Sequence, residues 1–175
     1  MDAGEISLNL YDEEWEFNGV THDRQISRAI VFDGEGYFYF MRVDRDDDFG
    51  NARYIETAGG GVEEGESPDS AIMRELYEEL GAEVEVVCKL GVVSDYYNLI
   101  YRHNINNYYL CRVISFGETH MTEDEIHSFH LSKLRLTYEE AIAEYERSAT
   151  TPLGRLLAQR ELPVLNHAKR VLADI

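Results

Sequence analysis

The chain has 175 residues, a length that fits one domain with a sizeable buried core. It carries 34 acidic and 16 basic residues, and the formal net charge of −18 argues against binding to a nucleic-acid backbone, for which a basic patch supplies the affinity. No apolar run approaches the roughly 18 residues of a membrane-spanning helix, and the acidic N-terminus lacks a signal-peptide pattern. We therefore expect a soluble, cytoplasmic protein that binds neither nucleic acid nor membrane.

The first part of the chain is predicted to be β-rich. Residues 6–10 and 15–17 are expected to form a hairpin within an N-terminal arm that spans residues 1–24. Residues 25–32 and 37–43 are strands, because both runs are rich in β-branched and aromatic residues and the Asp-Gly-Glu-Gly stretch between them is a strong hairpin signal.

The next segments lead into a run of glycines. Residues 44–51 are acidic and contain glycine, so a loop is predicted there. Residues 54–57 form a short strand that ends at the glycines of residues 59–61. We expect the backbone at Gly59, where no side chain intrudes, to lie close to a functional group.

A helix with clear start and stop signals follows these glycines. Ser67 is a good N-cap, Pro68 suits the first helical position, and Gly81 supplies the left-handed residue that ends the helix. One side of this helix is predicted to be an apolar face that packs on a core. The members of that face are Ile72, Met73, Leu76, Tyr77 and Leu80.

The opposite side of the helix carries three carboxylates. Glu75, Glu78 and Glu79 share one stripe, because positions i, i+3 and i+4 lie on the same face. Like charges at this spacing destabilise a helix by roughly 0.2–0.5 kcal/mol per pair, and a hard cation with oxygen ligands, such as Mg²⁺, removes that repulsion. Arg74 lies beside the stripe and is expected to make a bidentate pair with Glu66. A solvated acidic face is the alternative interpretation.

Further strands and helices complete the chain. Residues 83–94 and 107–115 are predicted strands, and residues 138–147 form a helix. Two more helices, 152–160 and 163–173, are expected to be separated by Pro163. Cys88 and Cys111 lie far apart without metal-ligand spacing, so they are expected to be small core residues in a reducing compartment.

The glycine turn and its helix together resemble a known signature. From Gly60 to Ala82 the sequence follows the box of the Nudix (MutT-like) hydrolases, with Glu66, Arg74-Glu75-Leu76, Glu78-Glu79 and Gly81 in register. Ala82 stands where a larger aliphatic residue is usual, and Ala58 replaces a frequent proline; neither difference touches a charged residue. The resemblance extends more loosely over residues 25–145.

The resemblance implies both a fold and a metal centre. The fold would be α+β, with a mixed β-sheet in an α/β/α sandwich, and residues 1–175 would form a single domain with a C-terminal helical extension at residues 148–175. Glu78 and Glu79 would be the central ligands of Mg²⁺ or Mn²⁺, with Glu75 as a further ligand or base. The carbonyl of Gly59 would be another ligand, and Glu66 and Arg74 would orient the acids.

An additional acid is expected from a later loop, as in many members of this family. Glu125 is the first choice and Glu123 the second, with Glu118 and Asp124 in the same region. Either carboxylate on its own is at least as well explained by a solvated loop. Three loop histidines are further candidates for metal or phosphate contact: His120, His127 and His130.

Substrate contacts are less specific in the sequence. Arg28, Arg42 and Arg102 are candidates for phosphate contact, and Tyr97 for stacking on a base; core or surface positions are the alternative for each. No proline lies between Pro68 and Pro152, which disfavours the ADP-ribose-cleaving branch, and the upstream pattern of the coenzyme A branch is missing.

The resulting functional expectation is a Mg²⁺-dependent hydrolase that cleaves the pyrophosphate linkage of a nucleoside diphosphate derivative by water attack. The partner would be a small phosphorylated nucleotide-type substrate, and a homodimer is left open. The alternative is a non-catalytic domain that senses a nucleotide ligand. Such domains usually lose one or more box acids, whereas this chain keeps all of them.

Overall fold

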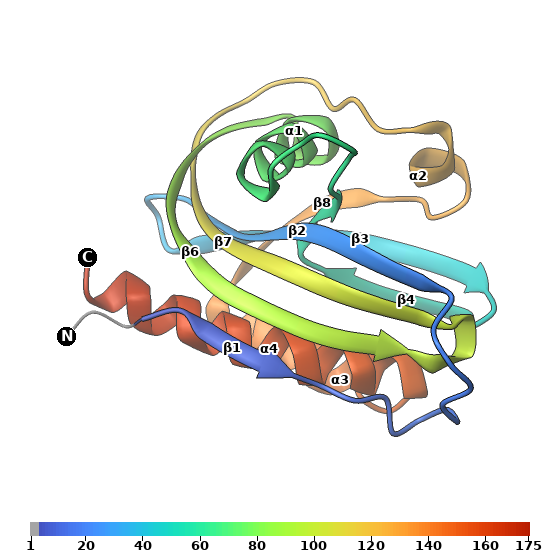
Figure 1. Cartoon of the computed structure of the whole chain (residues 1–175). Helices are drawn as coiled ribbons and strands as arrows, with labels where there is room; N and C mark the ends of the chain where they lie inside the picture. Colours follow the sequence, from blue (N-terminus) through green and yellow to red (C-terminus); the bar gives the residue numbers. More distant parts are fainter. Residues whose placement is uncertain (1–3) are drawn as a thin grey trace.

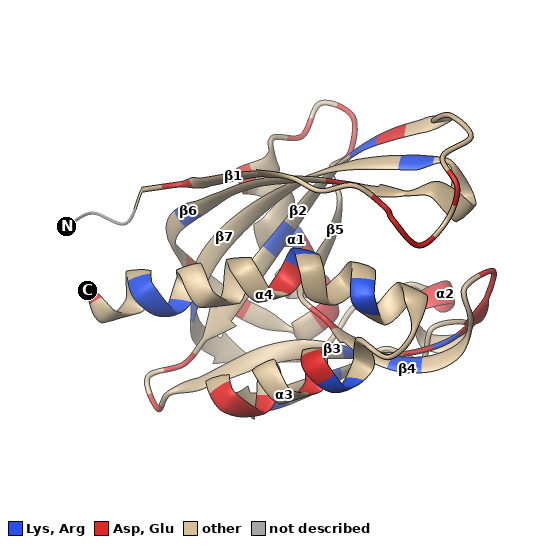
Figure 2. Cartoon of the chain, turned by 90° about the horizontal axis from the view of Figure 1, so that it is seen from below, with Lys and Arg blue, Asp and Glu red and all other residues tan. Residues whose placement is uncertain are grey.

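The computed structural model describes residues 4–175 and shows a β-sheet enclosed between helices (Figure 1). Helix α1 covers one face, and α3 and α4 lie side by side on the other (Figure 2). The elements are β1 (Ile6–Asn9), β2 (His22–Phe32), β3 (Tyr37–Asp47), β4 (Gly50–Glu56), β5 (Ala58–Gly61), α1 (Pro68–Leu80), β6 (Ala82–Tyr97), η1 (Asn98–Ile100), β7 (Arg102–Phe116), α2 (Glu123–His127), β8 (Ser132–Thr137), α3 (Tyr138–Ser148) and α4 (Pro152–Ala173).

The sheet is mixed, with strand order β1-β6-β7-β2-β3-β4. Strand β2 runs parallel to β7, and β1 runs parallel to β6, while the remaining pairs are antiparallel. This arrangement confirms the expected α+β class and the α/β/α sandwich. Within the described part of the chain, no helix combines the length and apolar character needed to span a membrane.

Strands β2 and β3 pair over only a short distance and then separate. Their register is limited to Val31 with Tyr39 and Phe32 with Phe38. Beyond this point β2 pairs with β5, whereas β3 pairs with β4 and β8. The sheet is therefore split at one end, between the half that contains β2 and the half that contains β3.

Alternating side chains on the strands supply two cores. Ala29, Val31 and Tyr39 pack with the apolar side of α1, while Ile30 and Phe40, at the intervening positions, pack with α3 and α4. This alternation follows from the two-residue period of a strand. Both faces of the central strands are buried, which fixes their register.

A buried charge cluster joins α4 to the sheet. Arg160 is fully buried; its Nη1 lies 3.1 Å from Asp95 Oδ2 and its Nη2 lies 2.9 Å from Glu161 Oε1. Its Nη1 also donates to the hydroxyl of Tyr97 at 2.7 Å. Removing one partner of such a cluster leaves a buried charge uncompensated, which typically destabilises a protein by about 3–5 kcal/mol.

The N-terminal arm differs from the expected hairpin. Residues 6–9 instead form an edge strand parallel to β6, and residues 15–17 are not a strand. The intervening loop is held by Asp12, whose carboxylate accepts hydrogen bonds from the backbone N–H groups of Glu14, Trp15 and Asn98. These local hydrogen bonds replace the strand pairing that a hairpin would have supplied.

The predicted loop at residues 44–51 is also wrong. Strands β3 and β4 continue through it and turn tightly between Asp47 and Gly50. The acidic residues are tolerated because basic residues pair with them: Arg53 Nε donates to Asp44 Oδ1 at 2.7 Å, and Arg45 contacts Asp47 at 2.8 Å. Asp44 and Arg53 are register partners across β3 and β4, where opposite charges stabilise the strand pairing, whereas Arg45 and Asp47 lie on the same strand.

Pro163 does not divide the C-terminal helix, contrary to the prediction. Helix α4 is continuous from Pro152 to Ala173. A proline inside a helix costs about 3 kcal/mol, but apolar side chains on both sides of it are buried against the sheet, including Leu156, Leu157, Val164 and Leu165. Packing over the whole length of the helix outweighs the local loss.

The box helix agrees with its start and stop signals. Ser67 accepts a hydrogen bond from Ser70 N, and Gly81 is left-handed, with a φ of 61°. The apolar face is narrower than expected: Ile72, Leu76 and Leu80 are buried, whereas Met73 and Tyr77 are about half exposed.

We predict that Gly91→Ala loosens strand β1. Gly91 has a φ of +144°, and a Cβ there would lie 2.0 Å from the carbonyl oxygen of Ile6, its register partner. The strain and the lost packing should lower the free energy of unfolding by about 1–3 kcal/mol. Hydrogen exchange should accelerate selectively at residues 6–9.

The matched control is Gly34→Ala, where the φ is ordinary and no atom lies within 4 Å of the added Cβ. Unchanged exchange at residues 6–9 in Gly91→Ala would contradict this account of β1.

Candidate functional site

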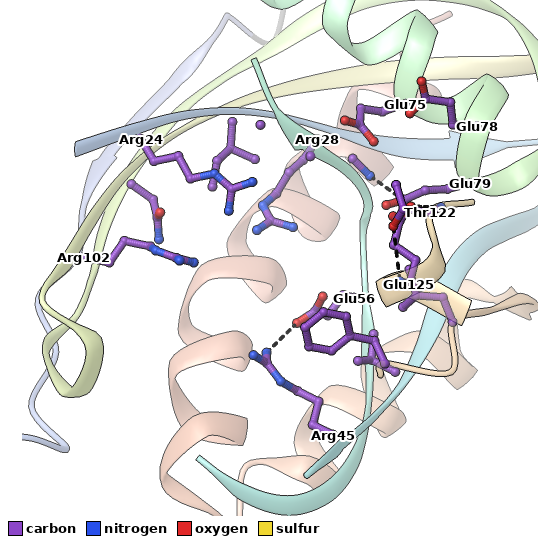
Figure 3. Close-up of a pocket in the computed structure, with 18 of the residues that line it drawn as sticks. Arg24, Arg28, Arg45, Glu56, Glu75, Glu78, Glu79, Arg102, Thr122 and Glu125 are labelled. Carbon is purple, nitrogen blue, oxygen red and sulfur yellow. Dashed lines mark hydrogen bonds and ion pairs between the residues drawn. The ribbon is translucent and has the colours of Figure 1, made fainter. Parts of the chain in front are cut away.

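A cavity of about 490 Å³ lies where the sheet splits. It has the size of a small-molecule site and two sides of opposite charge, as Figure 3 shows. We call Glu75, Glu78, Glu79 and Glu125 the acidic wall, and Arg24, Arg28 and Arg102 the basic wall. The acidic wall comes from α1 and α2, and the basic wall from β2 and β7.

The glycines of β5 allow the acidic wall to form. A Cβ at Gly60 would lie 2.5 Å from Glu75 Oε1, and a Cβ at Gly59, where φ is +148°, would lie 2.1 Å from the carbonyl oxygen of Ser27. Both distances are shorter than any van der Waals contact. The strand can therefore approach β2 and the α1 carboxylates only because it has no side chains here.

Two of the box carboxylates are buried. Glu79 is 6% exposed and Glu75 is 8% exposed. Glu79 Oε2 accepts a hydrogen bond from the backbone N–H of Gly59 at 3.1 Å. Burial, together with repulsion from Glu75 and Glu125, raises the pKa of Glu79 well above its ordinary value, and burial also raises the pKa of Glu75.

Arg74 organises the remaining acids, as expected for its pairing with Glu66. Its Nε and Nη2 donate to the two carboxylate oxygens of Glu66 at 2.8 and 2.9 Å. Its Nη1 donates to Glu75 at 2.8 Å and to Glu78 at 3.3 Å. The hydrogen bonds from Arg74 lower the pKa of Glu66 to about 2.

The loop candidates differ in their positions. Glu125 lies in the cavity wall, where its charge adds to the raised pKa of Glu79; Glu123 points to solvent, with a side chain 90% exposed, and pairs with His127. His120 stacks on Tyr77 at 4.8 Å between ring centroids. Neither these histidines nor His130, Glu118 or Asp124 belong to the described residues that line the cavity.

The acidic wall has the chemistry of a hard-cation site. Its carboxylates are oxygen donors, and burying two of them without a cation raises their pKa values. Among residues 4–175, no three acidic, histidine or cysteine side chains converge closely enough to hold an ion as they stand. Arg74 draws Glu75 and Glu78 toward itself, so these two carboxylates would have to turn toward a bound cation.

Three of the four predicted substrate residues lie in the cavity wall. Arg28, Arg102 and Tyr97 line it, whereas Arg42 does not. Arg42 lies at the strand position between Val43 and Met41 and pairs with Ile55 and Ser132 in register, so its side chain belongs to a different face from the cavity-lining Val43. The structure gives no support to a phosphate contact from Arg42.

Sequence reasoning missed several residues of the cavity wall. Arg24, Arg45, Glu56 and Asn104 all line it. The two-residue period of β2 could have indicated Arg24, because Arg24 and Arg28 point to the same face as Ile26. Arg45 was hidden by the false loop at residues 44–51, whereas Glu56 lay in the predicted strand 54–57 and is placed at the cavity beside Arg45 by the pairing of β3 with β4.

Comparisons with known proteins agree with this geometry. The model of the NUDIX domain matches residues 23–154. Similar solved structures include a MutT protein from Methanosarcina mazei Go1, with TM-score 0.60, 17% identity and coverage of 89% of this chain and 97% of that one. The E. coli ORF135 protein has TM-score 0.56 and 24% identity, with coverage of 87% and 92%.

A NUDIX hydrolase from Nitrosomonas europaea is also similar, with TM-score 0.59, 16% identity and coverage of 71% of this chain and 79% of that one. A search of curated proteins found no significant match. At these identities the structural likeness shows a shared fold, and the family model spans most of the chain. The chain therefore belongs to the NUDIX family, and at that level the sequence's indication of a Nudix pyrophosphohydrolase is confirmed.

Proposed function

We propose that the protein is a Mg²⁺-dependent hydrolase that cleaves the pyrophosphate linkage of a nucleoside diphosphate derivative. The observation that carries this proposal is the pair of buried carboxylates, Glu75 and Glu79, in the wall of a cavity that also holds the three arginines of the basic wall. Arg74 pairs with Glu75 but no basic side chain among the described residues pairs with Glu79, and a buried acid without a compensating charge is unfavourable for the fold and typical of a functional site. The basic wall, on the opposite side of the cavity, offers positive charge to a phosphorylated substrate.

Glu75, Glu78 and Glu79 would hold the cation, with the Gly59 carbonyl and Glu125 as further oxygen ligands. When bound, Mg²⁺ supplies positive charge to the phosphoryl oxygens and makes a bound water more acidic; Mn²⁺ is an alternative with similar ligands. Glu66 positions Arg74, which donates to Glu75 and Glu78 until these carboxylates turn toward the cation. A carboxylate of the acidic wall that the cation does not fully engage would accept a proton from the attacking water.

The cavity favours direct attack by water. Among the described residues that line it, none is serine, cysteine or histidine, and Thr122 is the only one with an aliphatic hydroxyl. A covalent mechanism usually requires a nucleophile with a neighbouring base. Water activated at the acidic wall needs no protein nucleophile, and a carboxylate there would accept its proton.

Solved structures with this fold include a UDP-X diphosphatase, which has TM-score 0.57 and 15% identity, with coverage of 87% of this chain and 66% of that one. Its name shows that diphosphate cleavage occurs on the same fold. Fold alone does not fix the substrate, so a panel of nucleotides assayed with Mg²⁺, with both products identified, is the direct test of the proposed function.

The competing function is a ligand-sensing domain without activity. It is disfavoured by the complete set of box acids and by the hydrogen bonds through which Arg74 holds three of the carboxylates.

We predict that Glu78→Gln and Glu79→Gln each reduce kcat by about a hundredfold or more, since removing an anionic ligand removes several kcal/mol of transition-state stabilisation. Activity should also disappear in excess chelator and return with Mg²⁺. The matched control is Glu123→Gln, an exposed carboxylate outside the cavity, which should retain full activity. Full turnover in chelator would rule out the metal mechanism.

We also predict opposite stability changes for two neutralised acids in metal-free protein at pH 7.5. The raised pKa of Glu79 means that its contribution to stability is present below the ordinary 4.5 and is lost as pH rises through the folded-state pKa. Glu79→Gln should therefore melt at a higher temperature than the wild type. It keeps an oxygen that can accept the Gly59 N–H.

The contribution of Glu66 to stability depends on pH in the opposite direction. Its lowered pKa means that its stabilising contribution is present above the ordinary 4.5 and is lost as pH falls toward about 2. Glu66→Gln should therefore melt at a lower temperature than the wild type.

Mg²⁺ should raise the melting temperature of the wild type through mass action, and this shift should be reduced in Glu79→Gln. Equal changes in both variants would contradict the charge assignment.

Direct attack by water predicts the fate of a labelled oxygen. Under single-turnover conditions in heavy-oxygen water, one labelled oxygen should enter the phosphate of one product, giving a nucleoside monophosphate and a second phosphate-bearing product. Mass spectrometry of the products measures this. A phosphorylated enzyme, with unlabelled product in the first turnover, would point to a covalent intermediate instead.

A further inference from the structure

The arginines of the basic wall form no ion pair with the described residues, although Glu75 acts on Arg24 and Glu56 and Glu161 act on Arg28 from a longer distance. Within residues 4–175, neither Arg24 nor Arg102 has a carboxylate at ion-pair distance, and Arg28 donates instead to the neutral amide of Asn106 at 3.0 Å. Arg45, in the same cavity, is by contrast paired with Asp47 and Glu56. In a chain with a net charge of −18, unpaired arginines in one cavity indicate an anionic ligand.

Strand geometry gathers these arginines at one place. Strands β2 and β7 run parallel, with Arg24 paired in register with Asn104 and His22 with Arg102. Alternate residues share a face, so Arg24 and Arg28 point to the same side as Arg102 and Asn104. Figure 3 shows the three guanidinium groups directed into the cavity, across from the box glutamates. Burial and repulsion from Arg102 and Arg28 lower the pKa of Arg24.

A second, independent feature lies among the arginines. Asn104 is 1% exposed and lines the cavity, yet neither its Nδ2 nor its Oδ1 has a hydrogen-bond partner. Leaving buried polar atoms unsatisfied costs about 1–3 kcal/mol per group, and such a group in a native protein calls for a ligand or a water. The amide offers one donor side and one acceptor side.

The combination selects a ligand chemistry. A phosphate dianion matches the forked donors of two or three arginines and also accepts from Asn104 Nδ2. Asn104 Oδ1 needs a donor, which a phosphate oxygen without a proton cannot supply but a neighbouring hydroxyl can. A phosphate ester beside a free hydroxyl, as on a phosphorylated ribose, satisfies both sides of the amide.

We propose that the basic wall and Asn104 bind a phosphate ester on a sugar of the substrate, separate from the pyrophosphate linkage that is cleaved. The substrate is then a nucleotide derivative with a phosphorylated ribose. This proposal rests on the proposed function for the cleavage at the acidic wall, but the binding of the phosphate ester depends only on the basic wall.

The test measures binding in excess chelator, by titration calorimetry, to ligands that differ by one phosphate. The probes are 5′-AMP, ADP, adenosine 2′,5′-bisphosphate and adenosine 3′,5′-bisphosphate. We expect one bisphosphate to bind at least about tenfold more tightly than 5′-AMP, as for one charge-assisted contact, and more tightly than ADP. AMP and the bisphosphates contain no pyrophosphate, so the measurement is independent of hydrolysis.

Variants assign the gain to the basic wall. Arg102→Met and Arg24→Met should each reduce the preference for the bisphosphate by about tenfold, which brings its affinity toward that of 5′-AMP. Arg112→Met is the matched control. Arg112 lies on the same strand as Arg102, and its replacement removes the same charge. Its Nη2 pairs with Glu85 Oε2 at a distance of 3.2 Å, and Arg112 is not among the described residues that line the cavity. It should keep the full preference.

Asn104→Leu separates a binding role from a structural one. Replacing an unpartnered amide with an apolar group of similar size should raise the melting temperature while lowering affinity for the bisphosphate. If Asn104 instead had only a structural role, Asn104→Leu would lower both the melting temperature and the affinity for the bisphosphate.

Two results would overturn the proposal. The first is that both bisphosphates bind no more tightly than 5′-AMP. The second is that ADP binds as tightly as the bisphosphates, because the basic wall would then bind the end of a phosphate chain. In a further outcome, the protein hydrolyses no nucleotide but still prefers the bisphosphate, and that preference is lost in Arg102→Met. Such a result would support the phosphate-ester site at the basic wall and refute the proposed activity. Hydrolysis without that preference would support the activity and refute the phosphate-ester site.

Discussion

Strand β5 presses its backbone against the carboxylates of Glu75 and Glu79, and this contact determines how the rest of the site is built. A side chain at Gly60 would occupy the place of the Glu75 carboxylate, and one at Gly61 would lie 2.8 Å from Arg24 Nη2. The same short strand therefore has acids against one of its glycines and a basic group against the next. It separates the two charged walls by only the thickness of a backbone.

The support beneath the cavity is itself charged. Tyr97 lines the cavity and accepts a hydrogen bond from Arg160, which is held in turn by Asp95 and Glu161. Glu161 also accepts from Thr57, the residue just before β5, and from Tyr108. Helix α4, near the end of the chain, thus fixes the position of a cavity residue and of the segment that leads into the glycines. A buried ionic network of this kind favours one arrangement over others more than it adds stability.

The sequence was sufficient for the local features of the box, since capping, left-handed glycine and the Glu66–Arg74 pairing all depend on residues a few positions apart. It was insufficient where contacts between segments distant in sequence determine the local structure. The parallel addition of β1 to β6 and the continuity of α4 through Pro163 result from packing against strands far away in sequence. Strand β8 was missed although Ser132–Thr137 alternates apolar and polar residues, because its short run resembles a loop until β3 supplies a partner.

The basic wall was only partly visible for the same reason. Arg28 and Arg102 could be named as cations near strands, but their meeting with Arg24 and Asn104 depends on the register of β2 with β7. Nor could composition reveal that Glu79 is buried, since amphipathic acidic helices usually face solvent. Burial at Glu79 follows from the glycines opposite it, and that contact is tertiary.

The parallel pairing of β2 with β7 has a consequence for biosynthesis. His22 pairs with Arg102 and Phe32 with Arg112, so β2 leaves the ribosome long before its partner exists. At about 5–20 residues per second, the wait is on the order of 4–16 s. During it, the edge of β2 that later pairs with β7 has no partner, because the elements made earlier, β3 and β5, pair with β2 elsewhere. The acidic composition then protects the nascent chain, because like-charged chains repel one another before their strand edges can associate.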